Sequence, residues 1–250
     1  MIPSPAANPR HPPTQRRGPV TERAVEFSGR VVELFASAAD PEAAAQMSAY
    51  MRDLFAFYGI KAGPRRELQR RAAAGLPAPS ATDLDAIART LWARAERECQ
   101  YAACDHLRRH VKAVDAAFLP TAAMLVTTKA WWDTVDILAA HVVGPIVAAD
   151  PASRAVVDGW LRSGDMWLAR TAILHQLAYR DATDADWLFD ACLHWAGSPE
   201  FFLRKAIGWA LRAYSRTAPA RVAAFVDAHR DELSPLSVRE ATKHLPPQAP

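Results

Sequence analysis

A short motif recurs along the second half of the chain at an almost constant spacing of 34 and 35 residues. It reads Arg170-Thr-Ala-Ile, Arg204-Lys-Ala-Ile and Arg239-Glu-Ala-Thr. An aromatic or leucine side chain stands two to three positions before each arginine: Trp167, Phe202 and Leu236. Trp132 lies 35 residues before Trp167, so we expect it to share this register. A fixed period of this length is typical of stacked structural units.

The residues between these motifs follow a helical period. Alanine, leucine and arginine are prominent, and the alternation of Val, Ile and Thr that indicates strands is absent. Helix starts are indicated at residues 40–47 (DPEAAAQM), 80–87 (SATDLDAI) and 198–205 (SPEFFLRK). Helix pairs that cannot bury their own apolar faces stack on their neighbours. The sequence therefore predicts an all-α protein, an α-solenoid of HEAT-like helix-pair repeats with a concave inner face. A helical bundle with coincidental spacing is the alternative.

The length and composition indicate one large domain. The chain has 250 residues, half of them hydrophobic, which can bury a substantial core. We expect residues 1–20, rich in proline and arginine, to be a disordered tail. Residues 21–246 would form a single domain, and residues 247–250 a flexible end.

The chain carries no sign of secretion or of membrane insertion. Its three cysteines show no CxxC pair, which argues against a disulfide framework and favours a reducing cytoplasm. The N-terminus lacks an apolar segment, and we expect no later run of about 18 apolar residues. The net charge of +3 is only weak evidence for a polyanionic partner.

Residues 129–136, KAWWDTVD, place two tryptophans beside two aspartates. In a helix, Trp132 and Asp136 project from one face, with Lys129 three residues before the ring. Trp131, Val135 and Leu138 form a separate apolar stripe that can be buried while the first face stays free. The alternative is that Asp136 is a solvated helix carboxylate paired with Lys129.

Residues 201–216, FFLRKAIGWALRAYSR, contain four cations and no acid. A helical projection gathers one tryptophan and three of the cations on one face: Lys205, Trp209, Arg212 and Arg216. Cations that neutralise phosphates, combined with a ring that packs on sugar or base, are typical of a nucleic-acid surface. The alternative is a partly buried tryptophan at a helix contact, surrounded by solvated arginines.

One further cluster has residues that can bind metals. Residues 98–110, ECQYAACDHLRRH, contain two cysteines and two histidines, His106 and His110, spaced four apart. The cysteines do not share the histidine face, and no HExxH or CxxC spacing occurs. We therefore expect no metal site here, and the absence of glycine-rich phosphate loops and dinucleotide fingerprints leads us to expect no cofactor.

The sequence resembles the AlkD-type DNA alkylation repair glycosylases, a family built from HEAT-like repeats. The resemblance runs from about residue 26 to residue 245 and is carried by six segments: AAAQMSAYMRDLFAFYGIKAGPRR, LWARAERECQYAA, KAWWDTVD, WLARTAILHQL, EFFLRKAIGWALRAYSRT and LSPLSVREATKHL. It implies that Trp132 and Asp136 are catalytic, that Trp209 is a second wall tryptophan, and that Arg170 and Tyr50 line the same cleft. The long N-terminal tail departs from the family pattern.

The resemblance also implies an activity and a partner. Such an enzyme hydrolyses the N-glycosidic bond of cationic alkylpurines, N7-methylguanine and N3-methyladenine, in double-stranded DNA, while the base stays in the duplex. We expect a cytoplasmic monomer that contacts DNA through Arg170, Tyr50, Lys129, Lys205, Arg212 and Arg216. The alternative is a non-catalytic HEAT-like solenoid that binds DNA or scaffolds a partner.

Overall fold

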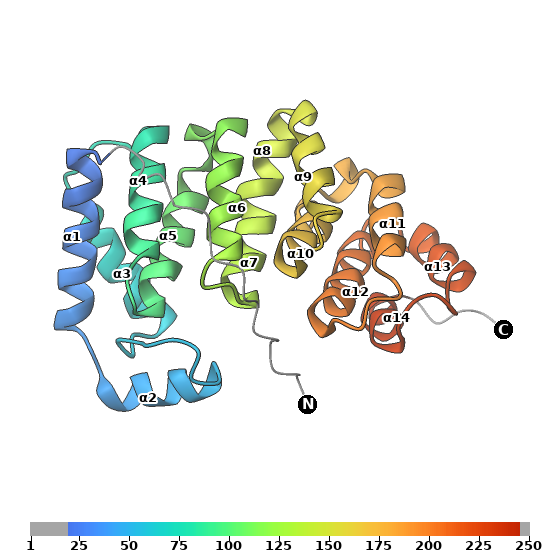
Figure 1. The fold of residues 1–250 in the computed structure, drawn as a ribbon, viewed down its shortest axis with the longest axis horizontal. Helices are drawn as coiled ribbons and strands as arrows, with labels where there is room; N and C mark the ends of the chain where they lie inside the picture. Colours follow the sequence, from blue (N-terminus) through green and yellow to red (C-terminus); the bar gives the residue numbers. More distant parts are fainter. Residues whose placement is uncertain (1–19, 246–250) are drawn as a thin grey trace. The chain divides into compact units, whose positions relative to one another are not determined.

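The computed structural model describes residues 20–245 of the chain (Figure 1). In this part of the chain the regular structure is helical, and one isolated bridge between Ala56 and Glu96 is its only β-type pairing. The all-α prediction is therefore confirmed. The predicted flexible end, and all of the predicted tail except Val20, lie outside the described residues.

The described chain divides into two compact units, residues 20–121 and residues 122–245. The single domain expected over residues 21–246 stays a prediction. The N-terminal unit contains α1 (Glu22–Ser37), α2 (Pro41–Tyr50), α3 (Ala62–Ala73), α4 (Ala81–Trp92) and α5 (Arg97–Arg109). Two short 3₁₀ turns follow, Val111–Ala113 and Ala116–Phe118, before α6 (Leu119–Thr127) leads into the C-terminal unit.

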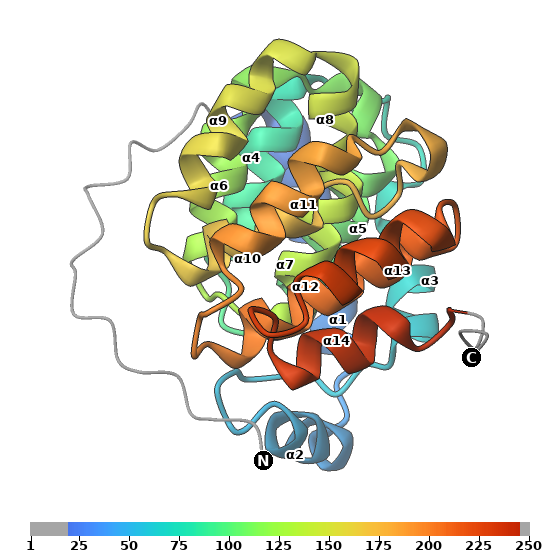
Figure 2. The same ribbon diagram turned by 90° about the vertical axis from the view of Figure 1, so that its right-hand side faces the viewer.

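The C-terminal unit contains α7 (Trp132–Leu138), α8 (Gly144–Ala149), α9 (Arg154–Leu161), α10 (Met166–Leu174), α11 (Ala185–His194), α12 (Phe201–Ser215), α13 (Pro219–Ala228) and α14 (Pro235–Thr242). Within this unit α9 packs on α10 and α13 packs on α12, while α10, α12 and α14 follow one another side by side (Figure 2). The predicted HEAT-like repeat of helix pairs is confirmed. The predicted concave groove involves both units and stays a prediction.

The predicted helix starts lie where the sequence placed them. Asp40 caps α2 by accepting from the Glu42 and Ala43 amides, ahead of a proline in the first turn. Ser80 caps α4 in a reciprocal capping box with Asp83. The third start differs in detail, because Glu200 is the N-cap of α12 and makes no side-chain cap.

Hydrogen bonds join successive repeats at or next to the positions of the repeated motif. The Arg170 guanidinium of α10 donates to the Phe202 carbonyl of α12. The buried Ser237 hydroxyl of α14 donates to the Arg204 carbonyl of α12 at 2.9 Å. Gly208 permits the close approach of α12 and α14, because a Cβ there would lie 2.5 Å from the Glu240 Cβ. The motif therefore marks the contacts between neighbouring helix pairs.

A π-helical turn, Ala139–Val143, joins α7 to α8 in one continuous run. The Gly144 amide bonds the Ala139 carbonyl five residues earlier, and Pro145, next in the chain, has no amide hydrogen to donate. The whole run Trp132–Ala149 has a mean hydropathy of 1.3 and is long enough to cross a membrane. The expectation that no such run exists is therefore wrong. More than half of the run is buried inside the protein, as in the core helix of a globular unit.

Candidate functional site

The two faces predicted for KAWWDTVD are present in α7. Trp131 is the N-cap residue in an extended conformation, and its ring is 3% exposed. Val135 and Leu138 are fully buried on the same side. Trp132 and Asp136 are half-buried on the other face of the helix, one turn apart. The separation into a buried stripe and a partly free face is confirmed.

Asp136 forms a bidentate ion pair with Arg170 of α10. The Arg170 Nε donates to one carboxylate oxygen and Nη2 to the other, each at 2.7 Å. The remaining terminal nitrogen of Arg170 donates to the Phe202 carbonyl of α12, and the whole residue is 1% exposed. This pairing replaces the predicted alternative of an Asp136–Lys129 pair. Lys129 precedes α7 and has a left-handed backbone conformation, with φ of 49°.

The ion pair places Asp136 under two opposing electrostatic influences. Burial raises the pKa of the Asp136 carboxyl above its usual range. The charge and hydrogen bonds of the Arg170 guanidinium oppose that rise, and Asp133 adds to it. The two-pronged geometry fixes the orientation of the carboxylate, because a planar guanidinium matches both of its oxygens. Asp136 is therefore a carboxylate in a fixed orientation, and its pKa depends on its burial, on Arg170 and on Asp133.

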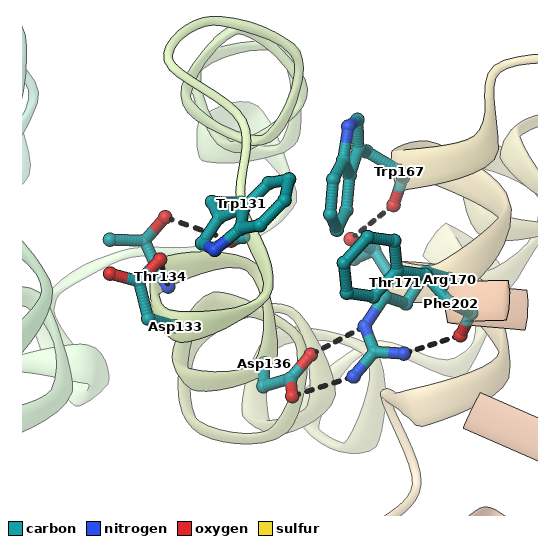
Figure 3. A network of polar contacts seen from close by, with 8 residues as sticks. All are labelled: Trp131, Asp133, Thr134, Asp136, Trp167, Arg170, Thr171 and Phe202. Carbon is teal, nitrogen blue, oxygen red and sulfur yellow. Dashed lines mark hydrogen bonds and ion pairs between the residues drawn. The ribbon is translucent and has the colours of Figure 1, made fainter. Parts of the chain in front are cut away.

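An aromatic cluster flanks the ion pair (Figure 3). The ring centroids of Trp131 and Phe202 are 5.1 Å apart, and those of Trp167 and Phe202 are 4.9 Å apart. The register prediction is wrong by one residue here, because Trp131, not Trp132, packs against Trp167 and Phe202. The extended backbone at the start of α7 turns the Trp131 ring inward and leaves Trp132 on the opposite face.

The Arg170 guanidinium lies against the ring of Trp209 on α12 as well as pairing with Asp136. The Arg170 carbon Cζ lies 5.6 Å from the centroid of the Trp209 ring. Lys205 and Arg212 also lie near this ring, at 5.6 and 5.8 Å. The structure therefore brings together three residues that sequence reasoning placed in one site: Asp136, Arg170 and Trp209. Trp209 is half-buried, so part of the ring remains accessible.

Sequence reasoning missed Glu240, an acid that faces the basic stripe of α12. Its carboxylate pairs with Lys205 at 2.7 Å and with Arg212 at 2.8 Å. The hydrogen bond from Lys205 holds the pKa of Glu240 below its usual range. The repeated motif could have indicated this acid, because Glu240 lies 35 residues after Lys205 and occupies the equivalent position of the next repeat. Searching α12 alone for acids could not find it.

Arg216, the last cation of the predicted stripe, is exposed at the end of α12. It borders an open hollow of about 610 Å³ that is also lined by Trp209, Arg212 and Arg180. This α12 hollow thus combines three arginines with one face of a tryptophan. Such a surface has the charge and the shape to receive a phosphate backbone.

Two predicted DNA contacts have different settings. Tyr50 ends α2 in the N-terminal unit and is 76% exposed. Arg170 is buried in the ion pair described above, so this structure does not present its guanidinium to a phosphate.

The three cysteines do not form disulfides: Cys99, Cys104 and Cys192 are buried free thiols. Residues 20–245 contain no cluster of three metal-binding side chains.

These features define an all-α protein of HEAT-like repeats, with a carboxylate, an arginine and a tryptophan brought together from α7, α10 and α12. The sequence matches the family model described as DNA alkylation repair enzyme over residues 31–245. The chain belongs to the DNA alkylation repair enzyme family. No curated protein matches the sequence.

One solved structure supports the same assignment. It is described as a predicted DNA alkylation repair enzyme from Enterococcus faecalis and is 32% identical to this chain. The match has a TM-score of 0.77 and covers 84% of this chain and 98% of the other. DNA alkylation repair is thus the role of the family, and DNA is the substrate that this role implies.

Proposed function

We propose that this protein is a monofunctional DNA glycosylase that acts as a monomer in base excision repair. It hydrolyses the N-glycosidic bond of cationic alkylpurines, such as N7-methylguanine and N3-methyladenine, in duplex DNA. The observation that carries the proposal is the Asp136 carboxylate, which Arg170 holds by both oxygens next to Trp209. A binding surface alone has no use for a carboxylate at this place, since it repels phosphate.

The reaction needs a group that stabilises positive charge. An alkylated purine is already cationic, so the bond between the base and C1′ of the sugar breaks with its electron pair moving to the base, and no general acid is required. Positive charge then develops on the deoxyribose. The Asp136 carboxylate stabilises that charge and orients the water whose oxygen bonds C1′, and the proton released by the water passes to the carboxylate or to solvent.

Arg170 positions Asp136 in this proposal. All three of its nitrogens are engaged, two by Asp136 and one by the Phe202 carbonyl. The carboxylate therefore has one orientation before DNA arrives, and preorganised charge is the largest source of rate in many enzymes. This role replaces the direct DNA contact that the family resemblance led us to expect for Arg170.

Trp132 and Trp209 form the walls of the site in the proposal. An electron-rich ring face favours a cationic sugar by about 1–2 kcal/mol when water is excluded. Trp209 already has three cationic side chains within 6 Å of its ring centre, which supports this preference. A base that remains stacked in the duplex needs no enclosed pocket, so we assign no base-flipping step.

The DNA backbone is held by the basic stripe of α12 in the proposal. Arg216 is exposed and carries its full charge, whereas Lys205 and Arg212 share Glu240. Glu240 thus reduces the positive potential beside Trp209 and limits the affinity for undamaged DNA. Tyr50 and Lys129 remain proposed contacts.

One observation favours a second function, a HEAT-like module that binds DNA without chemistry. The Asp136–Arg170 pair bridges α7 and α10 and is largely buried, as expected of a purely structural ion pair. In this second function the Asp136 carboxylate only joins two repeats, and the basic stripe of α12 binds DNA without any catalytic step.

The deciding experiment measures the release of free base. Purified protein is mixed in excess with a duplex that carries one N7-methylguanine, without added metal and with a chelator present. We expect free N7-methylguanine, detected by mass spectrometry, and an equal amount of abasic DNA. A parallel preparation of Asp136→Asn controls for contaminating glycosylases. Tight binding of the duplex without release above the background would establish the second function.

A further inference from the structure

The N-terminal unit contains a hollow that the alkylation chemistry does not use. It has a volume of about 430 Å³, within the range of small-molecule sites, and lies among α1, α3, α5 and the segment 76–78. Five arginines line it, opposed by a single carboxylate: Arg23, Arg66, Arg70, Arg108 and Arg109, with Asp105. We refer to it as the α3–α5 hollow. All of these residues belong to one compact unit.

Within the described chain three of these five arginines make no ion pair, whereas Arg70 pairs with Glu67 on α3 and Arg66 lies near Asp105. The Asp105 carboxylate is engaged by Arg65 at 2.9 Å and lies 3.6 Å from Arg66. No described residue forms an ion pair with Arg23, Arg108 or Arg109. Clustered cations without counter-charges repel one another, and an anion placed among them relieves that repulsion.

Three residues that line the hollow each have a buried polar atom without a hydrogen-bond partner in the described chain. These atoms are the Arg23 Nη1, the His106 Nε2 and the Gln69 Oε1. His106 is 2% exposed and Gln69 is 8% exposed. A buried polar atom that makes no hydrogen bond is unfavourable by about 1–3 kcal/mol, so three of them around one hollow call for an explanation.

These atoms are two potential donors and one acceptor. The Arg23 Nε already donates to the Pro77 carbonyl at 2.8 Å, which fixes the side chain and leaves Nη1 free to donate. The Gln69 Nε2 donates to the Ala102 carbonyl at 2.9 Å, so its Oε1 remains as an acceptor. A matching ligand therefore carries anionic oxygens and at least one O–H group.

The pKa values of the two histidines that line the hollow, His106 and His110, are lowered by burial and by the nearby arginines. Burial, together with the charges of His110, Arg23 and Arg109, lowers the pKa of His106 to about 3. The pKa of His110 is also lowered, first by burial and then by Arg109 and Arg23. Both rings are therefore neutral near pH 7. They add hydrogen-bonding capacity to the hollow while the arginines supply its charge.

We propose that the α3–α5 hollow is a binding site for a phosphate group that carries, or stands next to, a hydroxyl group. Arg109 of α5 and Arg70 of α3, which exchanges its exposed partner Glu67 for the ligand, bind the phosphate oxygens, since guanidinium groups favour this planar, paired recognition. The phosphate is either a free ion or part of a nucleic-acid backbone or end. The inference is independent of the glycosylase proposal, because none of its residues belongs to the Asp136 site.

The first test is a calorimetric titration of the full chain with inorganic phosphate at pH 7 and constant ionic strength, set with chloride. We expect saturable binding by the natural protein. The variant Arg70→Gln/Arg109→Gln should bind phosphate about tenfold more weakly or worse, because two charge-assisted contacts are lost. Both side chains are exposed, so the variant should melt close to the natural protein.

A matched variant controls for the loss of two charges. Arg71→Gln/Arg162→Gln also removes two exposed arginines, one next to Arg70 on α3 and one at the end of α9, and neither lines the hollow. It should bind phosphate like the natural protein. Absence of saturable binding by the natural protein would overturn the proposal. Equal weakening in both variants would do the same, since it would mean that only the net charge matters.

The second test identifies the source of the phosphate and uses undamaged duplex DNA. If a backbone phosphate occupies the hollow, the duplex displaces inorganic phosphate, and Arg70→Gln/Arg109→Gln makes the salt dependence of DNA binding shallower by about two. If a free phosphate occupies it, saturating phosphate leaves duplex affinity unchanged at equal ionic strength. Neither measurement needs a damaged base, so both can be read whether or not the glycosylase proposal holds.

Discussion

Replacing Asp136 by asparagine separates chemistry, binding and stability more sharply than any other substitution in this chain. The change keeps the shape of the side chain and removes its charge. It leaves the Arg170 guanidinium, 1% exposed, facing a neutral amide. The amide oxygen can accept from one of the two N–H groups that now reach Asp136, but the amide nitrogen is a donor and opposes the other.

The stability loss can be worked from this geometry. Removing one partner of a buried ion pair is unfavourable by about 3–5 kcal/mol. The lower end applies here, because the Asp136 side chain is 17% exposed and water can enter. A loss of about 3 kcal/mol corresponds to a fall in Tm of about 6–12 °C for a chain of this size. Since folded proteins are commonly stable by about 5–15 kcal/mol, the variant should still be folded at 25 °C.

The rate and the affinity should respond in different ways. Single-turnover release of N7-methylguanine should fall by about 10²-fold, or about 2.7 kcal/mol, as when one preorganised electrostatic group is deleted. Affinity for an uncleavable duplex should hold or rise, because a negative charge that repels phosphate has gone. The loss of rate should be smaller for lesions whose uncatalysed departure is already fast.

Asp133→Asn is the matched control. It removes a carboxylate from the first turn of the same helix, three residues away, and Asp133 is not the ligand of Arg170. Its stability should change by less than about 1 kcal/mol, with an unchanged release rate. A natural release rate in Asp136→Asn, or a parallel loss of affinity and rate, would refute the catalytic role of Asp136.

The remaining predictions concern pH, salt and packing. The release rate should fall on acidification at a pH above 3.8, the ordinary pKa of aspartate, because burial raises the pKa of Asp136 and only its ionised form is active. In Arg170→Gln this fall should move to still higher pH, because the two effects that lower the pKa are lost; an unchanged profile would contradict the positioning role. Arg216→Gln should make the salt dependence of DNA binding shallower by about one, and an unchanged slope would remove the end of α12 from the interface. Gly144→Ala should destabilise the protein by about 1–3 kcal/mol, measured by denaturant unfolding, because the new Cβ would lie 2.2 Å from a backbone oxygen. Gly159→Ala, with open space around it, is the control and should be neutral or stabilising.

The sequence was sufficient for features that depend on local periodicity. Helix identity, two of the three cap assignments and the split faces of α7 follow from residues within one or two turns of each other, so a single helical projection predicts them. The grouping of Asp136, Arg170 and Trp209 followed from the resemblance to a known family. Its geometric basis, one guanidinium shared by a carboxylate and a ring, needed coordinates.

The features that could not be predicted depend on contacts between repeats. Arg170 was expected to contact DNA from the family resemblance, and a projection of α10 does not show that Asp136 of α7 faces it. Glu240 lies on α14 and neutralises cations of α12, so a charge count within α12 overstates its positive potential. The one-residue error at Trp131 arose because a count of 35 residues back from Trp167 selects Trp132, whereas the ring that packs on Trp167 is that of Trp131 on the buried stripe of α7.

The ion pair at the site also bears on how the protein is made. Asp136 lies 34 residues before the arginine that orients it, and that arginine is anchored to a carbonyl 32 residues further on. During synthesis from the N-terminus, a nascent chain that ends before α10 carries Asp136 as an ordinary carboxyl without its partner. The bidentate arrangement of Asp136 arises only after α10 and α12 have docked. Under the proposed mechanism, α7 leaves the ribosome well before the chain can act on DNA, and we expect a protein truncated before α12 to lack glycosylase activity even with every residue of the KAWWDTVD segment intact.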